Sequence, residues 1–290
     1  MEYHLGRFDD ASLMVFKEKS LVAILPLHQD SKNVYSHLGL TYGGLAVGPT
    51  IKFSEYLDIF LSVLEYLNDK GFSKLFYKPI PKPYCILPSD EIDYLLFLCN
   101  AKLIRADISS TIFLDKPLKI QSNRMEGVKK AKKKGLSIKE DQNFKDFWEG
   151  VLIPNLDNKH QSEPTHSLKE IQLLASNFPE NIRQFNVYDQ ERLVGGATIF
   201  DHGHHVHVQY IAGGLDKQQL GTLDYLFHFL IKEVFKGRSY FDFGTSNENQ
   251  GKNVNGGLLY WKECFGARAI VQQQFVIETI KYKQLASVFL

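Results

Sequence analysis

The stretch of sequence that decides the fold is LDYLFHFLIKEVFKGRSYFDF, residues Leu223–Phe243. Its apolar residues recur at helical spacing, Gly237 is suited to a left-handed helix end, and a short aromatic strand follows. The same order occurs 166 positions earlier in LDIFLSVLEYLNDKGFSKLFY, residues Leu57–Tyr77, and six of the 21 aligned pairs are identical. The chain therefore repeats one helix-then-strand unit.

Two upstream segments repeat in the same order. One pair is HLGLTYGG at residues 37–44 and HVQYIAGG at residues 207–214, and the other is VFKEKSLVA at residues 15–23 and VYDQERLVG at residues 187–195. Together they read as a hairpin followed by paired glycines in each half. Three matches in one order favour an internal tandem duplication. The alternative is that any strand–strand–helix–strand unit looks alike.

The two halves are unequal in length. A strand, a basic helix, a short strand and further helical stretches separate Ile108 from the second hairpin, whereas only about a dozen residues precede the first hairpin. Either the N-terminal lobe is short, or the chain begins at an internal methionine, and we expect the second. The predicted architecture is a mixed α/β fold with a truncated lobe over residues 1–107 and a second lobe over residues 108–290.

Composition excludes several classes of protein. With 44% hydrophobic residues among 290, the chain can form a real core and is not wholly disordered. A net charge of +1 excludes a globally basic DNA-binding protein. Three scattered cysteines form no disulfide framework, and no signal peptide or membrane-spanning run occurs. We therefore expect a cytoplasmic protein that does not insert into membranes.

Particular motifs resemble those of GNAT-fold acyltransferases. In that family a Q/R-x-x-G-x-G/A loop before a helix holds the diphosphate of acyl-coenzyme A, and here the loop reads QQLGTL, with Leu223 replacing the last small residue. The segment NGGLLYWKECFGA at residues 255–267 and the basic helix from Arg124 to Gly135 resemble the Fem-related branch, as does a tandem pair of lobes. The resemblance implies two GNAT-like lobes, each a mixed sheet flanked by helices.

The resemblance places the acyl donor, acetyl-coenzyme A, in the second lobe. A glycine loop that opens a helix offers unpaired N–H groups and the positive end of the helix dipole, which suit a diphosphate. Backbone N–H groups near the strand end would face the donor's carbonyl oxygen. The expected donor-binding residues are Ile211, Ala212, Gly213, Gln218, Gln219, Leu220, Gly221 and Thr222. An ordinary strand-to-helix turn is the alternative.

Transfer to an amine requires a base, because an amine is protonated at neutral pH. Glu248 is the first candidate and Asp242 the second, since both follow or end the strand YFDFG, in which Asp242 points away from Phe241 and Phe243. Tyr260 is the candidate proton donor to the leaving thiolate, by resemblance alone. The alternatives are a structural carboxylate for Asp242, a solvated loop charge for Glu248 and a side chain packed on its helix for Tyr260.

Cations and polar groups around this site suit an anionic acceptor. The run from Arg124 to Lys134 holds six cations and one anion, so a nucleotide-sugar, a lipid-linked sugar or transfer RNA would suit it, although such runs usually mark a solvated helix face. We assign acceptor binding to Arg124, His207, Asn247 and Lys262. The histidines at 202–207 lack the further ligands of a metal site, so no metal is expected.

The sequence thus predicts an N-acyltransferase that moves an acyl group, acetyl in the first instance, from coenzyme A to an amine on a sugar or cell-envelope precursor. One alternative is a Fem-like transferase that takes an amino acid from aminoacyl-tRNA to a peptidoglycan precursor. The other is an inactive lobe pair that binds a ligand or partner. The coenzyme A assignment depends on Gly221 facing a cleft. If side chains fill that turn, or if it points away from any cleft, the proposed enzyme activity is withdrawn and only the predicted architecture remains.

Overall fold

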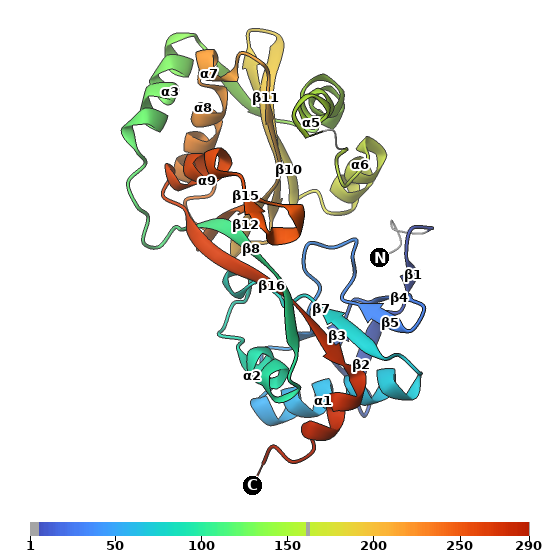
Figure 1. The fold of residues 1–290 in the computed structure, drawn as a ribbon. Coiled ribbons are helices and arrows are strands. Elements are labelled where there is room, and N and C mark those ends of the chain that lie inside the picture. The colour runs from blue at the N-terminus through green and yellow to red at the C-terminus, as the bar shows by residue number, and fades with distance from the viewer. Residues whose placement is uncertain (1–5, 161–162, 290) are drawn as a thin grey trace. The chain divides into compact units, whose positions relative to one another are not determined.

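The computed structural model describes residues 6–160 and 163–289 (Figure 1). The chain forms two compact units. The first unit holds residues up to Asp107 together with those from Val271 onward, and the second unit holds Ile108–Ile270. The sequence placed residues 271–290 in the second lobe, whereas the structure places them in the first unit. Among the described residues, no helix combines the length and apolar composition that a membrane span requires.

The second unit is built on a mixed sheet. One pair, β12 and β13, is parallel, and its other pairs are antiparallel. In spatial order the strands are β8 (Lys102–Phe113, of which residues from Ile108 belong to this unit), β13 (Tyr240–Thr245), β12 (His205–Gly213), β11 (Arg192–Asp201), β10 (Ile182–Asp189) and β9 (Ser137–Glu140). The mixed α/β fold predicted from the sequence is confirmed.

Helices cover both faces of this sheet (Figure 1). On one face lie α3 (Ser122–Lys133), α7 (Lys217–Leu220), α8 (Thr222–Phe229) and α9 (Gly256–Glu263). On the other lie α4 (Phe144–Phe147), the π-helical turn η3 (Trp148–Leu152), α5 (Ile153–His160) and α6 (Leu168–Asn177). The helix α6 begins with a capping box, in which Ser167 and Glu170 satisfy each other's backbone N–H groups.

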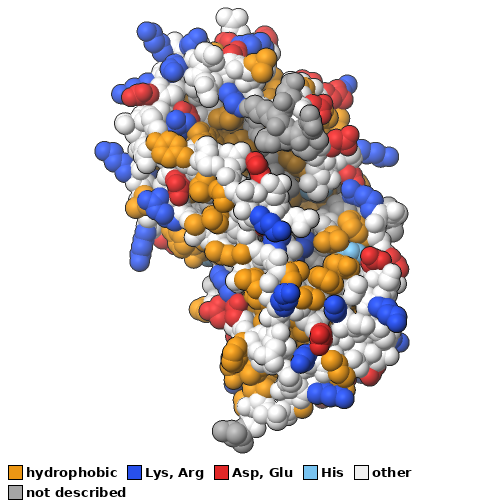
Figure 2. Space-filling model, viewed as in Figure 1, with side chains coloured by type: hydrophobic (Ala, Val, Ile, Leu, Met, Phe, Trp, Pro, Cys, Tyr) orange, Lys and Arg blue, Asp and Glu red, His pale blue; other side chains and the backbone are white. Residues whose placement is uncertain are grey.

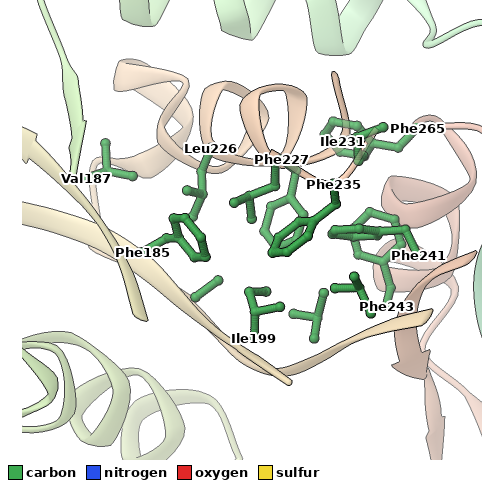
Figure 3. Close-up of a cluster of buried hydrophobic side chains, with 14 of the residues drawn as sticks. Phe185, Val187, Ile199, Leu226, Phe227, Ile231, Phe235, Phe241, Phe243 and Phe265 are labelled. Atoms are coloured by element: carbon green, nitrogen blue, oxygen red, sulfur yellow. The ribbon is translucent and has the colours of Figure 1, made fainter. Parts of the chain in front are cut away.

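Aromatic packing between the sheet and α8 forms the core of the second unit (Figure 3). Phe241 and Phe243 point from β13 towards Phe227 of α8, at ring-centroid distances of 6.1 and 5.1 Å. Strand alternation turns the residue between them, Asp242, to the opposite face, as the sequence predicted. The core therefore fixes where the polar side chain of β13 points.

The first unit contains two smaller groups of strands. One group runs β1 (Asp9–Asp10), β4 (His28–Asp30), β5 (Asn33–Tyr35), β7 (Lys74–Tyr77) and the end of β16 (Arg268–Glu278), and the other runs β2 (Leu13–Lys17), β3 (Ser20–Leu25) and β6 (Ala46–Val47). Helices α1 (Phe53–Asp69) and α2 (Glu91–Leu98) pack on its core. Because β16 pairs with β7 from Phe275 onward, the C-terminal residues belong to this unit.

In the repeated segments the hairpins agree in detail, whereas the ends of the helices differ. The hairpins β2–β3 and β10–β11 both shift register at aligned positions, after Val15 and after Val187, and their turns hold Glu18 and Gln190 at φ 53° and 56°. The helix ends differ. Gly71 adopts the expected left-handed conformation, at φ 83°, whereas Gly237 is not in that region, because a π-helical turn, η4 (Leu230–Val234), ends its helix earlier.

Candidate functional site

The parallel strands β12 and β13 part in the middle of the second unit. Their last paired residues are His207 and Asp242, although β12 continues to Gly213 and β13 to Thr245. Just beyond this pair, Tyr210 and Val208 lie opposite consecutive residues of β11, so Gln209 is an extra residue in β12. Such a bulge bends its strand and strengthens the local twist, which accounts for the parting.

The last pair carries a buried polar contact. His207 Nδ1 lies 3.1 Å from Asp242 Oδ2, and Asp242 is 1% exposed. The other carboxylate oxygen, Oδ1, accepts hydrogen bonds from Ser109 Oγ at 2.7 Å, Thr111 Oγ1 at 3.0 Å and the Gly244 backbone N–H at 3.1 Å. These donors hold the carboxylate in place. When Nδ1–H donates to it, the neutral imidazole presents Nε2 as its basic nitrogen.

A buried lysine lies at the end of β13. Lys262 of α9 is 2% exposed, and its ammonium donates to the carbonyl oxygens of Gly244 at 2.9 Å and Thr245 at 2.8 Å. Burial lowers the pKa of Lys262 to about 8, and the charge of Asp242 opposes this shift. Gly244 has φ 74°, and a side chain there would press on the His207 ring. Asp242, His207, Gly244 and Lys262 therefore form one cluster.

A cavity of about 450 Å³ opens beside the free end of β12. Its walls come from the end of β12, the start of α8, one side of α9, one position of α3, and two positions each of α5 and α7. The lining residues are Arg124, Asn155, Leu156, Ile211, Ala212, Lys217, Gln218, Leu223, Asp224, Asn255, Gly257, Leu258 and Trp261. Of the predicted donor-binding residues, Ile211, Ala212 and Gln218 are therefore in the cavity wall.

An ion pair closes one side of this cavity. Arg124 Nη1 donates to Asp224 Oδ1 at 2.9 Å, and Trp261 Nε1 donates to the same oxygen at 3.1 Å. Burial raises the pKa of Asp224, and the Arg124 charge works against that shift. Arg124 thus points into the cavity, where it already binds a carboxylate of the protein. The acceptor-binding role predicted for it stays a prediction.

One side of the turn at Gly221 is packed against α3. Gly221 is buried with φ 72°, and a Cβ placed there would overlap the backbone carbonyl of Gly127 in α3. Thr222 and Leu220 are also buried, and α3 covers the beginning of α8. The side of the turn that faces α3 therefore has no room for a ligand, whereas Gln219 on the turn is exposed. The donor contacts predicted for Gly221, Thr222, Leu220 and Gln219 stay predictions.

Several other predicted residues lie apart from the cavity wall. Glu248 is exposed in β14 (Asn247–Glu248) and accepts a hydrogen bond from Asn255 Nδ2 at 3.1 Å. Asn247 accepts from the Ile108 N–H at 2.6 Å and so ties its loop to β8. Tyr260 is exposed on α9. The backbone carbonyl of Gly213 accepts a hydrogen bond from Asn155 Nδ2. The sequence named Glu248 and Asp242 as candidate bases and gave His207 an acceptor-binding role, because only the register of β12 against β13 shows the His207–Asp242 contact.

The sequence matches no protein-family model and no curated protein. Solved structures are similar in fold. FemX matches with a TM-score of 0.66 at 12% identity, over 98% of this chain and 92% of that one. The C-terminal domain of a protein described as a lysylphosphatidylglycerol synthetase, from Agrobacterium fabrum, matches with a TM-score of 0.62 at 10% identity, over 95% and 87%.

A third structure is a tandem GNAT protein from the clavulanic acid biosynthesis pathway. Its TM-score is 0.51 at 11% identity, over 96% of this chain and 86% of that one. These matches confirm the GNAT-like, Fem-related fold that the sequence resembled. At such low identity the likeness concerns the fold alone.

Substitution at Gly221 tests the close crossing of α3 and α8. Gly221→Ala is expected to lower the free energy of unfolding by at least about 2 kcal/mol, because the new Cβ meets the Gly127 carbonyl in a backbone conformation that alanine disfavours. Urea unfolding followed by tryptophan fluorescence reports on this unit, since Trp148 and Trp261 both lie in it. The control, Gly237→Ala, has open space around it and should change stability by less than about 0.5 kcal/mol. Equal effects would show that the turn is not packed as described.

Proposed function

We propose that this protein transfers an acyl group to the nitrogen of an amine. The observation that carries the proposal is the His207–Asp242 pair, held where β12 and β13 part. An amine with a pKa of about 10.4 must lose a proton before it attacks. Neutral His207 Nε2 takes that proton, and the Asp242 carboxylate stabilises the imidazolium that forms. This base replaces Glu248 in our assignment, and Asp242 becomes its positioning residue.

The reaction proceeds by addition and elimination. The amine nitrogen forms a bond to the donor's carbonyl carbon, whose oxygen gains negative charge, and the bond to the leaving sulfur or oxygen then breaks. Two N–H groups of Lys262 are bound by backbone carbonyls, and we assign the third to this oxygen. Lys262 thereby supplies a positive charge in a buried place, where it acts more strongly than in water. His207 passes the first proton to solvent and then takes the second proton, which the nitrogen loses after it has bonded to the carbonyl carbon. His207 delivers this second proton to the leaving group, so that an amide and a neutral leaving group result.

The donor that we propose is an aminoacyl-tRNA. The side of Gly221 that faces α3 is packed against Gly127, so that side of the turn offers no place for the diphosphate of coenzyme A. Beside the cavity, α3 and its C-terminal cap present exposed lysines that can bind phosphates of an RNA backbone; these are Lys129, Lys130, Lys132, Lys133 and Lys134. Figure 2 shows basic side chains projecting from the side of the second unit where Figure 1 draws α3.

Coenzyme A is the second candidate donor. Gln218 and Lys217 still line the cavity, which can accept a slender thioester arm that enters without using the turn at Gly221. The acceptor that we propose is an amine on a sugar or cell-envelope precursor. The likeness in fold to FemX and to the lysylphosphatidylglycerol synthetase domain supports this choice of acceptor. If neither donor reacts, the remaining interpretation is an inactive pair of lobes that binds a ligand or a partner.

Direct assay of the two donors tests the proposal. We expect the protein to bind aminoacyl-tRNA with an affinity that falls with salt, and to release its amino acid to an acceptor amine. The double variant Lys129→Glu/Lys133→Glu should weaken tRNA binding at least about tenfold. Its control, Lys169→Glu, changes an exposed lysine on α6, on the other face of the sheet, and should not. Thiol release from acetyl-coenzyme A without tRNA binding would instead support the second donor.

Substitution of the two candidate bases distinguishes their roles. His207→Gln should lower turnover by about 10²- to 10⁴-fold, because no group then takes the amine proton. Glu248→Gln should leave turnover unchanged, since its side chain is exposed and bound to Asn255. Circular dichroism confirms that both variants fold. The opposite ranking would return the catalytic role to Glu248.

The pH dependence of turnover tests Lys262. Its pKa of about 8 means that the side chain is cationic below pH 8 and loses its charge as the pH rises through that value. Turnover should therefore fall above about pH 8, and Lys262→Met should be slow and lack this falling limb. A wild-type rate that stays constant from pH 7 to beyond pH 9 is incompatible with a catalytic ammonium here.

A further inference from the structure

The first unit exposes an apolar face on one edge of its three-stranded sheet. Strand β2 pairs with β3 and with nothing else in the part of the chain that the structure describes. Two cross-strand pairs point away from the core: Met14 opposite Ile24, and Phe16 opposite Leu21. Their exposed fractions are 67% and 44%, and 54% and 52%. An edge that is both unpaired and apolar is a template for another strand.

The second unit shows what covers the equivalent edge. Its hairpin β10–β11 shifts register at the position aligned with the shift in β2–β3. Each turn also holds a residue in the left-handed conformation at the aligned position, Gln190 and Glu18. There, β9 lies along the outer edge of β10, antiparallel to it, from Phe185 to Tyr188. These residues align with Leu13–Phe16 of β2. The edge of β2 therefore has the form of an edge that accepts one antiparallel strand.

We propose that the β2 edge of a second copy of this chain occupies that place and makes a two-fold dimer. A two-fold axis through Val15 pairs the strands antiparallel, as β9 pairs with β10, and sets Met14 opposite Phe16 of the partner. Residues 14 and 16 then lie on one face in both copies, because a register centred on one residue preserves the alternation. The two exposed apolar pairs of each copy join into one continuous strip.

Charge placement agrees with this pairing. Exposed acidic residues, Asp9 and Asp10, precede β2. Exposed basic residues lie at its end and in the turn that follows: Lys17, whose ammonium is also paired with Glu55 at 2.6 Å, and Lys19. In an antiparallel pair the beginning of one strand lies beside the end of the other, so acidic and basic groups of the two copies meet. A lipid surface would cover the apolar face but leave the edge N–H and C=O groups unpaired, so a strand suits this site better.

Solution mass tests the dimer. Light scattering with size-exclusion chromatography should give twice the 33.3 kDa chain mass at high concentration, with dissociation on dilution. Met14→Lys should raise the dissociation constant at least about tenfold, since it sets a charge against Phe16 of the partner. Met14→Lys/Phe16→Glu should restore the dimer, whereas Met14→Lys/Phe16→Lys should not. Met14 is exposed, so thermal unfolding of these variants should stay near that of the wild type.

Cross-linking tests the register directly. Val15→Cys places two thiols at the axis, where the backbones are close enough for a disulfide, and mild oxidation should give a covalent dimer. The matched control is Lys17→Cys, whose copies lie far apart in this register and should not cross-link. Both variants carry Cys85→Ser, because the other two native cysteines are buried.

Two results would overturn the proposal. One is a single 33.3 kDa species up to about 100 μM with no covalent dimer from Val15→Cys. The other is a dimer whose dissociation constant does not respond to Met14→Lys, which would place the contact elsewhere. Liposome binding by a monomeric protein, abolished by Met14→Lys, would also count against the second copy and assign the face to lipid.

Discussion

The parting of β12 from β13 is the constraint on which the candidate site depends. Up to His207 and Asp242 the strands share a parallel ladder, and the extra residue Gln209 then bends β12 away. A continued ladder would use the inner edges of both strands for backbone pairing. Because the ladder stops, the last pair keeps a histidine and a carboxylate in contact beside strand ends that are not joined to each other. The proposed proton transfer therefore depends on this interruption as well as on the side chains of His207 and Asp242.

Local patterns in the sequence predicted what local physics determines. The alternation of Phe241, Asp242 and Phe243 placed the carboxylate away from the core, and the structure agrees. The basic helix, the short strand and the further helical stretches before the second hairpin were also predicted, because periodicity acts over a few positions. The left-handed end expected at Gly237 was wrong, since tertiary packing lets the preceding helix widen into a π-turn.

The contents of the site depended on contacts that no local pattern records. Gly221 and Gly127 are 94 positions apart, and their crossing packs one side of the glycine loop against α3. A glycine inside a lysine-rich helix was the available signal, because glycine weakens a helix unless close packing requires it. The His207–Asp242 contact likewise depends on strand register. The sequence therefore identified the region of the chain that holds the site. The identity of the base could be assigned only from the register of the strands in the sheet.

The two hairpins show how far identical local geometry leaves function open. Val187 is fully buried between strands and helices of the second unit, whereas Val15, at the aligned position, is only partly buried. The register shift and turn conformation are the same, so the surroundings decide the burial. The first unit keeps the apolar pattern of a covered sheet on a hairpin whose outer edge is open in the described chain. Apolar side chains at such an edge are costly in water unless another strand covers them. That imbalance is the physical reason to look for a partner there.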